Sequence, residues 1–331
     1  MRPHRSFFLG LLIALLLVGG AIAYGNWLWE DFNNASDLAG DTTVVIPKGT
    51  GISGIADLLA DAKIIDNKLA FKLGARVVFE GRGLKAGEYA FPAHVSPRAA
   101  AQLMIDGKVV QHKVTIPEGL TIAEIYDLLT QAQFLDGDLP PAPGEGRLLP
   151  ETYLYQRGES RNAIIDRMQH DMQAALEKLW SARDMSIPLK SPAEAIIIAS
   201  MIEKETGIKD ERAHVASVFY NRMKLNMPLQ SDPTIIYTLS KGKGRLDRAL
   251  TYSDLKIDDP YNTYTNTGLP PGPIANPGID ALTAALHPQQ TKDLYFVADG
   301  SGGHAFAATL EEHNKNVAKW RKLQKANSDS N

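Results

Sequence analysis

The sequence predicts an α+β protein with an N-terminal transmembrane helix, a small α+β module and a larger α+β domain. Three features support this: an apolar run near the N-terminus, a repeated strand–turn–helix pattern, and a buried helix followed by proline-rich loops. The 331 residues are 44% hydrophobic and 22% charged, which is typical of globular proteins and allows more than one core.

The first element is an almost uninterrupted apolar run at residues 7–24. About 18 apolar residues can cross a bilayer core as a helix. The alternative is a cleaved signal peptide, because Ala21 and Ala23 have the small-x-small spacing of a cleavage site. Trp27 and Trp29 favour an uncleaved anchor, since tryptophan concentrates at membrane interfaces. Basic residues within 1–6 predict that this end stays in the cytoplasm and the rest lies outside the membrane.

The next elements form an internal repeat. The pattern of residues 45–66 recurs at 115–136 with a constant offset of 70 positions. Each copy is a strand, a Pro-x-Gly turn and an amphipathic helix. The glycines of the first copy match a dinucleotide fingerprint, but the second copy has a Thr121–Glu124 capping box there, so this position is simply a helix start. We expect one module at 42–137, also containing a strand at 85–91 and a helix at 96–105.

A linker rich in proline and glycine is predicted at 138–146, followed by a larger domain at 147–325 and a polar tail at 326–331. Within that domain, apolar residues at helical spacing from Ile164 to Leu179 indicate a core helix. Residues 293–309 are predicted to form a hairpin, and 311–324 a closing helix.

The most informative segment is 191–207. Ser191 and Glu194 predict a capping box, Pro192 occupies the first helical position, and Gly207 is expected to end the helix in the left-handed conformation. Apolar residues cover every face between these ends, so the helix is predicted to be buried.

The last turn of this helix carries two carboxylates. At about 100° per residue, Glu203 shares a stripe with Ile196 and Ala199, whereas Glu205 points nearly the opposite way. Desolvation on an apolar stripe raises a carboxyl pKa and keeps the group protonated, as a general acid requires. The alternative is structural pairing of either glutamate with Arg212 or Arg222.

Stiff loops follow at 230–234, 261–264, 268–274 and 276–278. Their prolines restrict the backbone, while tyrosine, asparagine and threonine side chains suit a carbohydrate cleft. A purely structural proline-rich connection is the alternative for each segment alone. The formal net charge of −3 gives no reason to expect nucleic acid, there is no cysteine, and the eight histidines lack ligand spacing, so neither a metal nor another cofactor is predicted.

These motifs resemble those of the endolytic murein transglycosylases, the YceG-like family. The resemblance covers essentially the whole chain and is strongest from Ser191 to Asn314, including the Glu-Lys-Glu-Thr motif, Gln-Ser-Asp-Pro-Thr, Tyr-Asn-Thr-Tyr and the glycine-rich hairpin with His304. It implies Glu203 as the catalytic acid. The segments that carry it supply the expected substrate-binding residues: Gln230, Ser231, Asp232, Thr234, Tyr261, Asn262, Tyr264, Asn276 and His304.

The resemblance implies a membrane-anchored bacterial enzyme with its catalytic domain on the periplasmic or extracytoplasmic side of the inner (cytoplasmic) membrane. Such enzymes cut the β-1,4 bond between N-acetylmuramic acid and N-acetylglucosamine and leave a 1,6-anhydro end, terminating or trimming nascent strands. Peptidoglycan glycan strands are the expected partner, and cell-wall synthases are a further class of partner. The repeat resembles half of a LysM-type fold, a peptidoglycan-binding module.

Two alternatives remain open at this point. A hydrolytic muramidase needs a second catalytic carboxylate, for which Asp232 is the candidate. A membrane-anchored, non-catalytic peptidoglycan-binding scaffold needs none. The product formed from glycan strands distinguishes all three.

Overall fold

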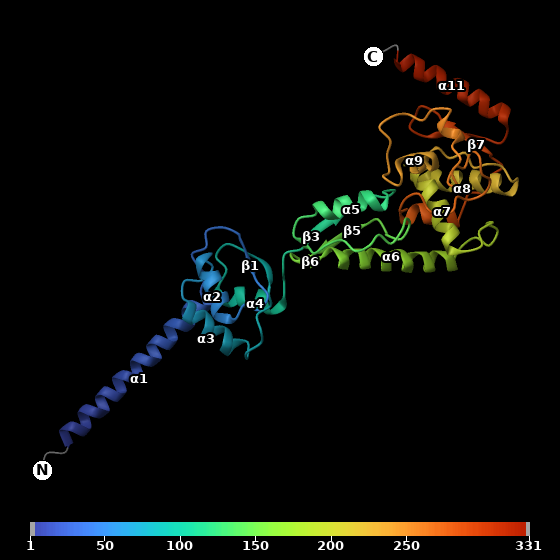
Figure 1. Cartoon of the computed structure of the whole chain (residues 1–331). Helices are drawn as coiled ribbons and strands as arrows, with labels where there is room; N and C mark the ends of the chain where they lie inside the picture. Colours follow the sequence, from blue (N-terminus) through green and yellow to red (C-terminus); the bar gives the residue numbers. More distant parts are fainter. Residues whose placement is uncertain (1–3, 329–331) are drawn as a thin grey trace. The chain divides into compact units, whose positions relative to one another are not determined.

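The computed structural model describes residues 4–328 and confirms the α+β class. The chain folds as two compact units, coloured in sequence order in Figure 1. The first extends to His112 and includes 156–158, and the second comprises 113–155 and the chain from Glu159 onward. The outer ends of the predicted cytoplasmic segment and polar tail, 1–3 and 329–331, lie outside the described residues.

The first unit contains α1 (His4–Asn33), β1 (Thr42–Ile46), α2 (Ile52–Asp61), α3 (Lys68–Val78), β2 (Gly87–Phe91) and α4 (Pro97–Asp106). β1 and β2 pair antiparallel, with Thr42 opposite Phe91 and Ile46 opposite Gly87. Their inward side chains and the helices form one core, whose largest buried members are Phe32, Phe71, Tyr89 and Phe91.

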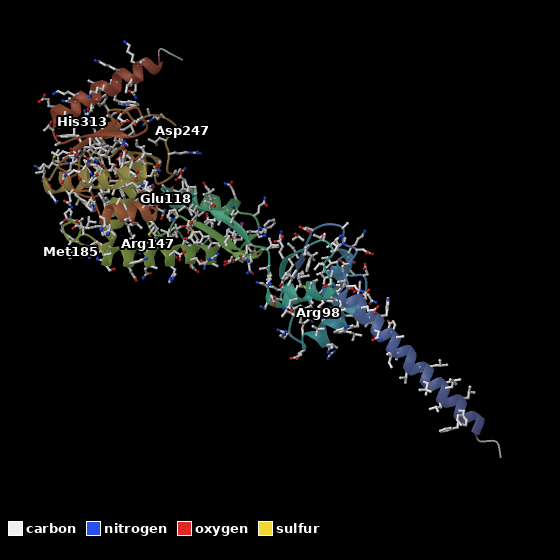
Figure 2. The ribbon with its side chains drawn as sticks, turned by 180° about the vertical axis from the view of Figure 1, so that it is seen from behind. Arg98, Glu118, Arg147, Met185, Asp247 and His313 are labelled. Carbon is white, nitrogen blue, oxygen red and sulfur yellow. The ribbon has the colours of Figure 1, made fainter. Side chains whose placement is uncertain are left out.

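Helix α1 contains the predicted 7–24 segment and continues to Asn33. From Phe7 it is long and apolar enough to cross a membrane, and this test does not separate an anchor from a signal sequence. Its C-terminal end packs into the first unit, because Phe32 is fully buried against Gly74 of α3. Arg98 of α4, labelled in Figure 2, donates to the Asn33 side chain at 3.1 Å.

The second unit begins with β3 (His112–Thr115), α5 (Ile122–Gln131), β4 (Leu135–Asp136), β5 (Thr152–Tyr155), β6 (Glu159–Ser160) and α6 (Arg161–Ser181). β3 pairs with β5, and β4 runs parallel to β6. Residues from α5 and α6, including Ile125, Leu129, Ile164 and Met168, share one core.

Both repeat copies form the predicted strand and helix, as β1–α2 and β3–α5, and the Thr121–Glu124 capping box is present. However, the copies lie in different compact units, so the expected 42–137 module does not coincide with either of them. The physical reason is pairing: β1 finds its partner in β2, whereas β3 finds its partner in β5, beyond the predicted linker.

The remaining elements are α7 (Pro192–Glu205), α8 (Lys209–Lys224), α9 (Asp232–Ser240), the short 3₁₀ helix η1 (Asp254–Lys256), α10 (Ile279–Leu286), β7 (Tyr295–Ala298), β8 (His304–Ala307) and α11 (Leu310–Ser328). α7 lies in the centre of this part of the unit and contacts α6, α8, α9 and α10. The predicted hairpin is confirmed, since β7 and β8 pair antiparallel with Ala298 opposite His304.

The ends of α7 differ in part from expectation. Ser191 accepts from the Glu194 N–H as predicted, but the Glu194 side chain accepts from Lys190 instead of completing a capping box. The prediction for Gly207 is wrong, because its φ is not positive. The chain leaves α7 through an extended Thr206, whose hydroxyl accepts from the Ile208 N–H in the turn before α8.

Candidate active site

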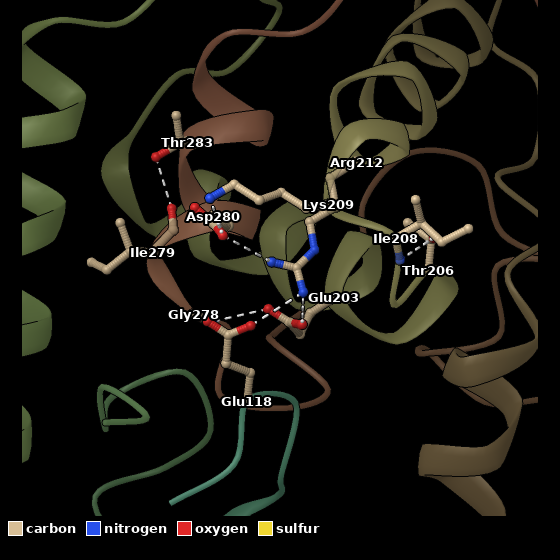
Figure 3. Close-up of polar contacts among 10 residues, drawn as sticks. All are labelled: Glu118, Glu203, Thr206, Ile208, Lys209, Arg212, Gly278, Ile279, Asp280 and Thr283. Carbon is tan, nitrogen blue, oxygen red and sulfur yellow. Dashed lines mark hydrogen bonds and ion pairs between the residues drawn. The ribbon is translucent and has the colours of Figure 1, made fainter. Parts of the chain in front are cut away.

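The last turn of α7 directs its two glutamates to different surroundings. Glu203 accepts a hydrogen bond from Nη2 of Arg212 at 2.7 Å and another from the Gly278 N–H at 3.0 Å (Figure 3). Only 5% of the Glu203 side chain and 8% of the Arg212 side chain are exposed. Of the alternatives raised by the sequence, pairing of Glu203 with Arg212 is the one observed.

This pair belongs to a larger network. Nη2 of Arg212 also donates to Glu118 at 3.1 Å, and its Nη1 lies 4.0 Å from Asp280. The Gly278 amide precedes α10, so the Glu203 carboxylate satisfies a free N–H at a helix start. Burial raises the pKa of Glu203, while the Gly278 N–H and the Arg212 charge act in the opposite direction. Glu203 therefore joins α7, α8 and α10.

Glu205 has a different environment. Its Oε1 accepts from the Ser231 hydroxyl at 2.5 Å. Burial raises the pKa of Glu205 to about 7, and the nearby Asp232 charge raises it further, while Ser231 and Arg222 favour the charged form. At neutral pH both the protonated and the ionised form of this carboxyl are therefore populated. The two glutamates thus point in different directions, as the helical spacing predicts: Glu205 contacts the loop at 230–234, whereas Glu203 contacts the loop at 276–278.

The loop before α9 brings Ser231 to Glu205. Gln230 has a φ of 54°, a left-handed conformation that turns the chain sharply. Its N–H donates to the Thr263 carbonyl, and the Ser231 N–H donates to the Thr263 hydroxyl at 3.0 Å. Buried Arg222 donates to the Leu229 carbonyl at 3.0 Å. Two loops distant in sequence thus fix the serine.

Asp232 and Tyr264 complete this side of the site. The Tyr264 hydroxyl donates to Oδ1 of Asp232 at 2.5 Å, and Asp232 is exposed at the first position of α9. Burial and the Asp232 carboxylate raise the pKa of Tyr264, so the phenol remains a donor at neutral pH. Tyr261 lies nearby in the chain and packs on Tyr237, with ring centroids 5.0 Å apart.

A cavity of 560 Å³ opens beside these residues. Asp232, Pro233 and Tyr237 of α9 line it together with Lys204 of α7 and Ile274 of the proline-rich loop. The segment 244–250, including Arg245, forms another wall. This size is typical of a ligand site, and the mixture of apolar, aromatic and charged groups suits a polar ligand with flat apolar faces, as sugars have.

Three predicted substrate-binding residues have no access to such a ligand. Thr234, Asn262 and Asn276 are each fully buried. Thr234 donates to the Ser231 carbonyl, and Asn262 donates to the carbonyls of Leu255 and Ile257. These side chains satisfy loop backbone groups that burial separates from water, which explains why polar residues occur there. The structure therefore gives these buried side chains a structural role and shows no surface through which they would contact substrate.

Asn276 joins three segments of the second unit. Its side chain accepts from the Leu148 N–H at 3.0 Å and donates to the Leu120 carbonyl and to Glu145. Glu145 also accepts from the Ile122 N–H at the start of α5, and burial raises its pKa to about 7. The second repeat copy is thereby fastened to the proline-rich loop.

His304 lies in another cluster. Its Nδ1 is 2.8 Å from Oε2 of Glu211, and its N–H donates to the other oxygen of the same carboxylate. Glu211 also accepts from Thr206. His304 thus holds the β7–β8 hairpin to the start of α8, and no described contact joins it to Glu205 or Asp232.

Sequence reasoning missed several residues of this region. Arg222 was expected only as a partner of a glutamate, but it shapes the loop at Ser231. Lys204 and Arg245 contribute charge to the cavity. Glu118 occupies the Pro-x-Gly turn of the second copy, where the first copy has Lys48.

Comparisons with a family model, with curated proteins and with solved structures all point to one family. The model of a family described as YceG-like matches residues 44–319. The endolytic murein transglycosylase of Bacillus subtilis is 35% identical over 92% of this chain and 91% of its own length. That of Streptococcus pneumoniae is 29% identical over 95% of this chain and 65% of its own length. A crystal structure of a YceG-like protein from Listeria monocytogenes is 32% identical, with a TM-score of 0.54 over 83% of this chain and 98% of its own.

Proposed function

The chain belongs to the YceG-like family, and from this premise we propose that it is an endolytic murein transglycosylase, a lytic enzyme acting on the glycan strands of peptidoglycan. The observation that carries the proposal for this chain is Glu205, a carboxyl with a pKa of about 7 that bonds to Ser231, next in the chain to Asp232, which lines a cavity of suitable size. Lytic cleavage needs one group that serves first as acid and then as base.

We assign this group to Glu205 and withdraw the expectation for Glu203. Both oxygens of Glu203 accept hydrogen bonds, one from Arg212 and one from the Gly278 N–H, and both donors favour its ionised form against the burial that raises its pKa. Glu205 is paired with no cation at hydrogen-bonding distance in the described part of the chain, and its hydrogen-bond partner is the neutral Ser231 hydroxyl. A general acid must hold a proton and release it, which favours Glu205.

The proposed reaction balances within the site. Because Ser231 donates to Oε1 of Glu205, the proton of the neutral acid is carried on Oε2. This proton passes to the glycosidic oxygen as its bond to the muramyl C1 breaks. The muramyl 6-hydroxyl then attacks C1, and its proton returns to the Glu205 carboxylate. The product is a 1,6-anhydro end, and no water is consumed.

The surrounding groups support each stage. The Ser231 hydroxyl and the Arg222 charge stabilise the carboxylate formed after proton transfer. Asp232 is exposed at the cavity, where a carboxylate suits stabilisation of the oxocarbenium-like carbon. Tyr264 holds Asp232 in place through its hydroxyl. Gln230, Tyr261 and Tyr237 are the remaining candidates for contacts with sugar.

Residues 7–24 of α1 are proposed as a single-pass anchor in the inner (cytoplasmic) membrane, with the N-terminus cytoplasmic and the chain after this segment on the other side. This placement would give the enzyme access to nascent strands, which it would terminate or trim, and to cell-wall synthases as partners. Glycan binding by the repeat, resembling a LysM-type module, is part of the same proposal.

The mass of the product tests the function. Purified full-length protein in detergent is incubated with uncrosslinked glycan strands, and the new ends are measured by mass spectrometry. The proposal predicts anhydromuramyl ends, which are one water lighter than reducing ends. Reducing ends would instead support a muramidase using Asp232, and intact strands would support a glycan-binding scaffold.

A further inference from the structure

Helix α3 exposes an apolar stripe that the first unit does not cover. Leu69, Leu73 and Val77 are exposed by 40%, 47% and 69%. The opposite face of the same helix is buried in the core through Ala70, Phe71, Gly74 and Ala75. At about 100° per residue, the three exposed positions fall within an arc of about 80°. They therefore form one continuous surface, which we call the α3 stripe.

The α3 stripe is continuous with the C-terminal part of α1. A groove of 190 Å³ lies between the two helices. Its lining residues come from both helices: Gly25, Leu28, Trp29, Ala70, Leu73, Gly74 and Val77. A Cβ added at Gly74 would lie 2.3 Å from the Phe32 ring, so the two helices approach as closely as a glycine permits. The position of α3 beside α1 is thus fixed by packing.

The proposed position of α1 in the bilayer sets the level at which the α3 stripe lies relative to the membrane. Residues 7–24 would span about 27 Å at 1.5 Å per residue, close to the thickness of the hydrocarbon core. Gly25, Leu28 and Trp29 therefore lie where the bilayer meets water. Trp27 and Trp29 are exposed by 52% and 47%, as expected for residues at that level. The α3 stripe, which shares the groove with them, lies at the same level.

Charge completes the pattern. α3 carries Lys68, Lys72 and Arg76 and no acidic residue. These basic positions occupy the arc next to the α3 stripe. Lys68 is paired with Asp57 at 2.7 Å, so Lys72 and Arg76 are the charges that remain for another partner. An apolar face bordered by cations is typical of helices that lie in the interface of an anionic membrane.

We propose that α3 is a second membrane contact: its apolar stripe enters the bilayer interface beside α1, while Lys72 and Arg76 bind anionic lipid headgroups. This inference rests on the proposed anchor and goes beyond it, because it fixes the orientation of the first unit at the membrane surface. The unit would lie against the lipid on its α3 side instead of swinging freely on a single helix. A lipid occupant is favoured over a protein because the stripe is continuous with a lipid-facing helix.

The chain contains no cysteine, which permits a direct test in the full-length protein. Leu73→Cys and Val77→Cys are spin-labelled and reconstituted in vesicles of phosphatidylethanolamine and phosphatidylglycerol. The collision rates of each label with oxygen, which dissolves in lipid, and with a water-soluble nickel chelate are then compared. Leu12→Cys, at an exposed position of α1, reports on the anchor. Val45→Cys is the matched control, since Val45 is 41% exposed on β1, away from the N-terminal half of α1 in Figure 1.

The expected result is preferential collision with oxygen at positions 12, 73 and 77 and with the nickel chelate at position 45. Replacing phosphatidylglycerol by phosphatidylcholine should reduce the oxygen preference at 73 and 77 and leave position 12 unchanged. Labels at 73 and 77 that behave like the label at 45 would overturn the proposal while sparing the anchor. Labels there that are shielded from both reagents would show a protein cover and would also overturn it. Aqueous exposure at position 12 would reject the anchor itself.

Discussion

Glu203 and Glu205 are two residues apart on one helix, yet they stand in chemically opposite surroundings. Glu203 accepts from an arginine and a backbone N–H, and it joins three helices. Glu205 accepts from a serine hydroxyl, lies beside another carboxylate, and has a pKa of about 7. Both are largely removed from water, so burial does not distinguish them. The partners do, because they decide which protonation state is stabilised.

The largest expected effect is that of Glu205→Gln on activity. Glutamine has the shape of the neutral acid and can still accept from Ser231, but it cannot donate a proton to the glycosidic oxygen. General acid–base catalysis contributes roughly 10²–10⁴-fold, so we expect kcat to fall by at least about 100-fold. Formation of anhydromuramyl ends on isolated glycan strands measures this.

The same variant carries its own folding control. The folded pKa of Glu205, about 7, exceeds the ordinary value of 4.5, so wild-type protein loses stability as pH rises from about 4.5 through 7. Glutamine does not ionise. Glu205→Gln should therefore be more stable than wild type at pH 8 and nearly equal to it at pH 4. Lower stability at both pH values would mean that the loss of activity reflects misfolding.

Glu203→Gln should have the opposite profile, with its main effect on stability. Removing one charge of a buried ion pair leaves Arg212 uncompensated, which costs about 3 kcal/mol. The free energy of unfolding can be followed in urea through Trp180 and Trp320, which belong to the second unit, after replacing Trp27 and Trp29 by phenylalanine. At low temperature the folded variant should retain activity within a few fold of wild type.

Glu118→Gln is the matched control for that variant. Glu118 bonds to the same arginine, but 41% of its side chain is exposed, so its loss should cost less than about 1 kcal/mol. Equal destabilisation by the two substitutions would contradict the assignment of Glu203 as the principal partner of Arg212.

The pH dependence of activity gives a further test. Since the acid must be protonated, kcat/KM should fall about tenfold per pH unit above the pKa of Glu205, which is about 7. The profile is measured between pH 5 and 9 at constant ionic strength. A descending limb centred below pH 5 would indicate a carboxyl that is ionised at neutral pH and would exclude Glu205 as the acid.

Ser231→Ala should have the smallest effect. Its hydroxyl stabilises the charged form of Glu205, so removal should raise the pKa and move the descending limb to higher pH by roughly one unit. We expect kcat at pH 6 to fall about tenfold or less, because the carboxylate formed during reaction loses one donor. An unshifted limb would show that Ser231 does not act through Glu205.

Much of the fold could be predicted because its signals are local. The repeat predicted β1–α2 and β3–α5, and the cap at Thr121 follows from four consecutive positions. The prediction for Gly207 was wrong because the chain leaves α7 through an extended Thr206, whose hydroxyl accepts from the Ile208 N–H in the turn before α8. The boundary between the compact units is not a local signal, because it depends on which distant strand pairs with β3.

The sequence predicted which segments form the candidate site, but it did not predict which side chains in those segments contact one another. A helical wheel gives the angle between Glu203 and Glu205, but α7 is apolar on every side, so no periodicity indicates which side faces the loops. Likewise, Asn262 and Asn276 carry the polar groups expected of a sugar-binding loop, yet they serve buried backbone groups. Only the tertiary structure separates these roles.

The most direct test of the central claim is the titration of the individual carboxyls. Full-length protein labelled with ¹³C at the glutamate δ-carbon is titrated by NMR, and resonances are assigned by comparison with Glu203→Gln and Glu205→Gln. Glu145 also has a pKa of about 7, so its resonance should persist in both variants. Our account predicts a second resonance with a midpoint near pH 7 that disappears in Glu205→Gln and persists in Glu203→Gln. It would be contradicted if that resonance disappeared in Glu203→Gln and persisted in Glu205→Gln.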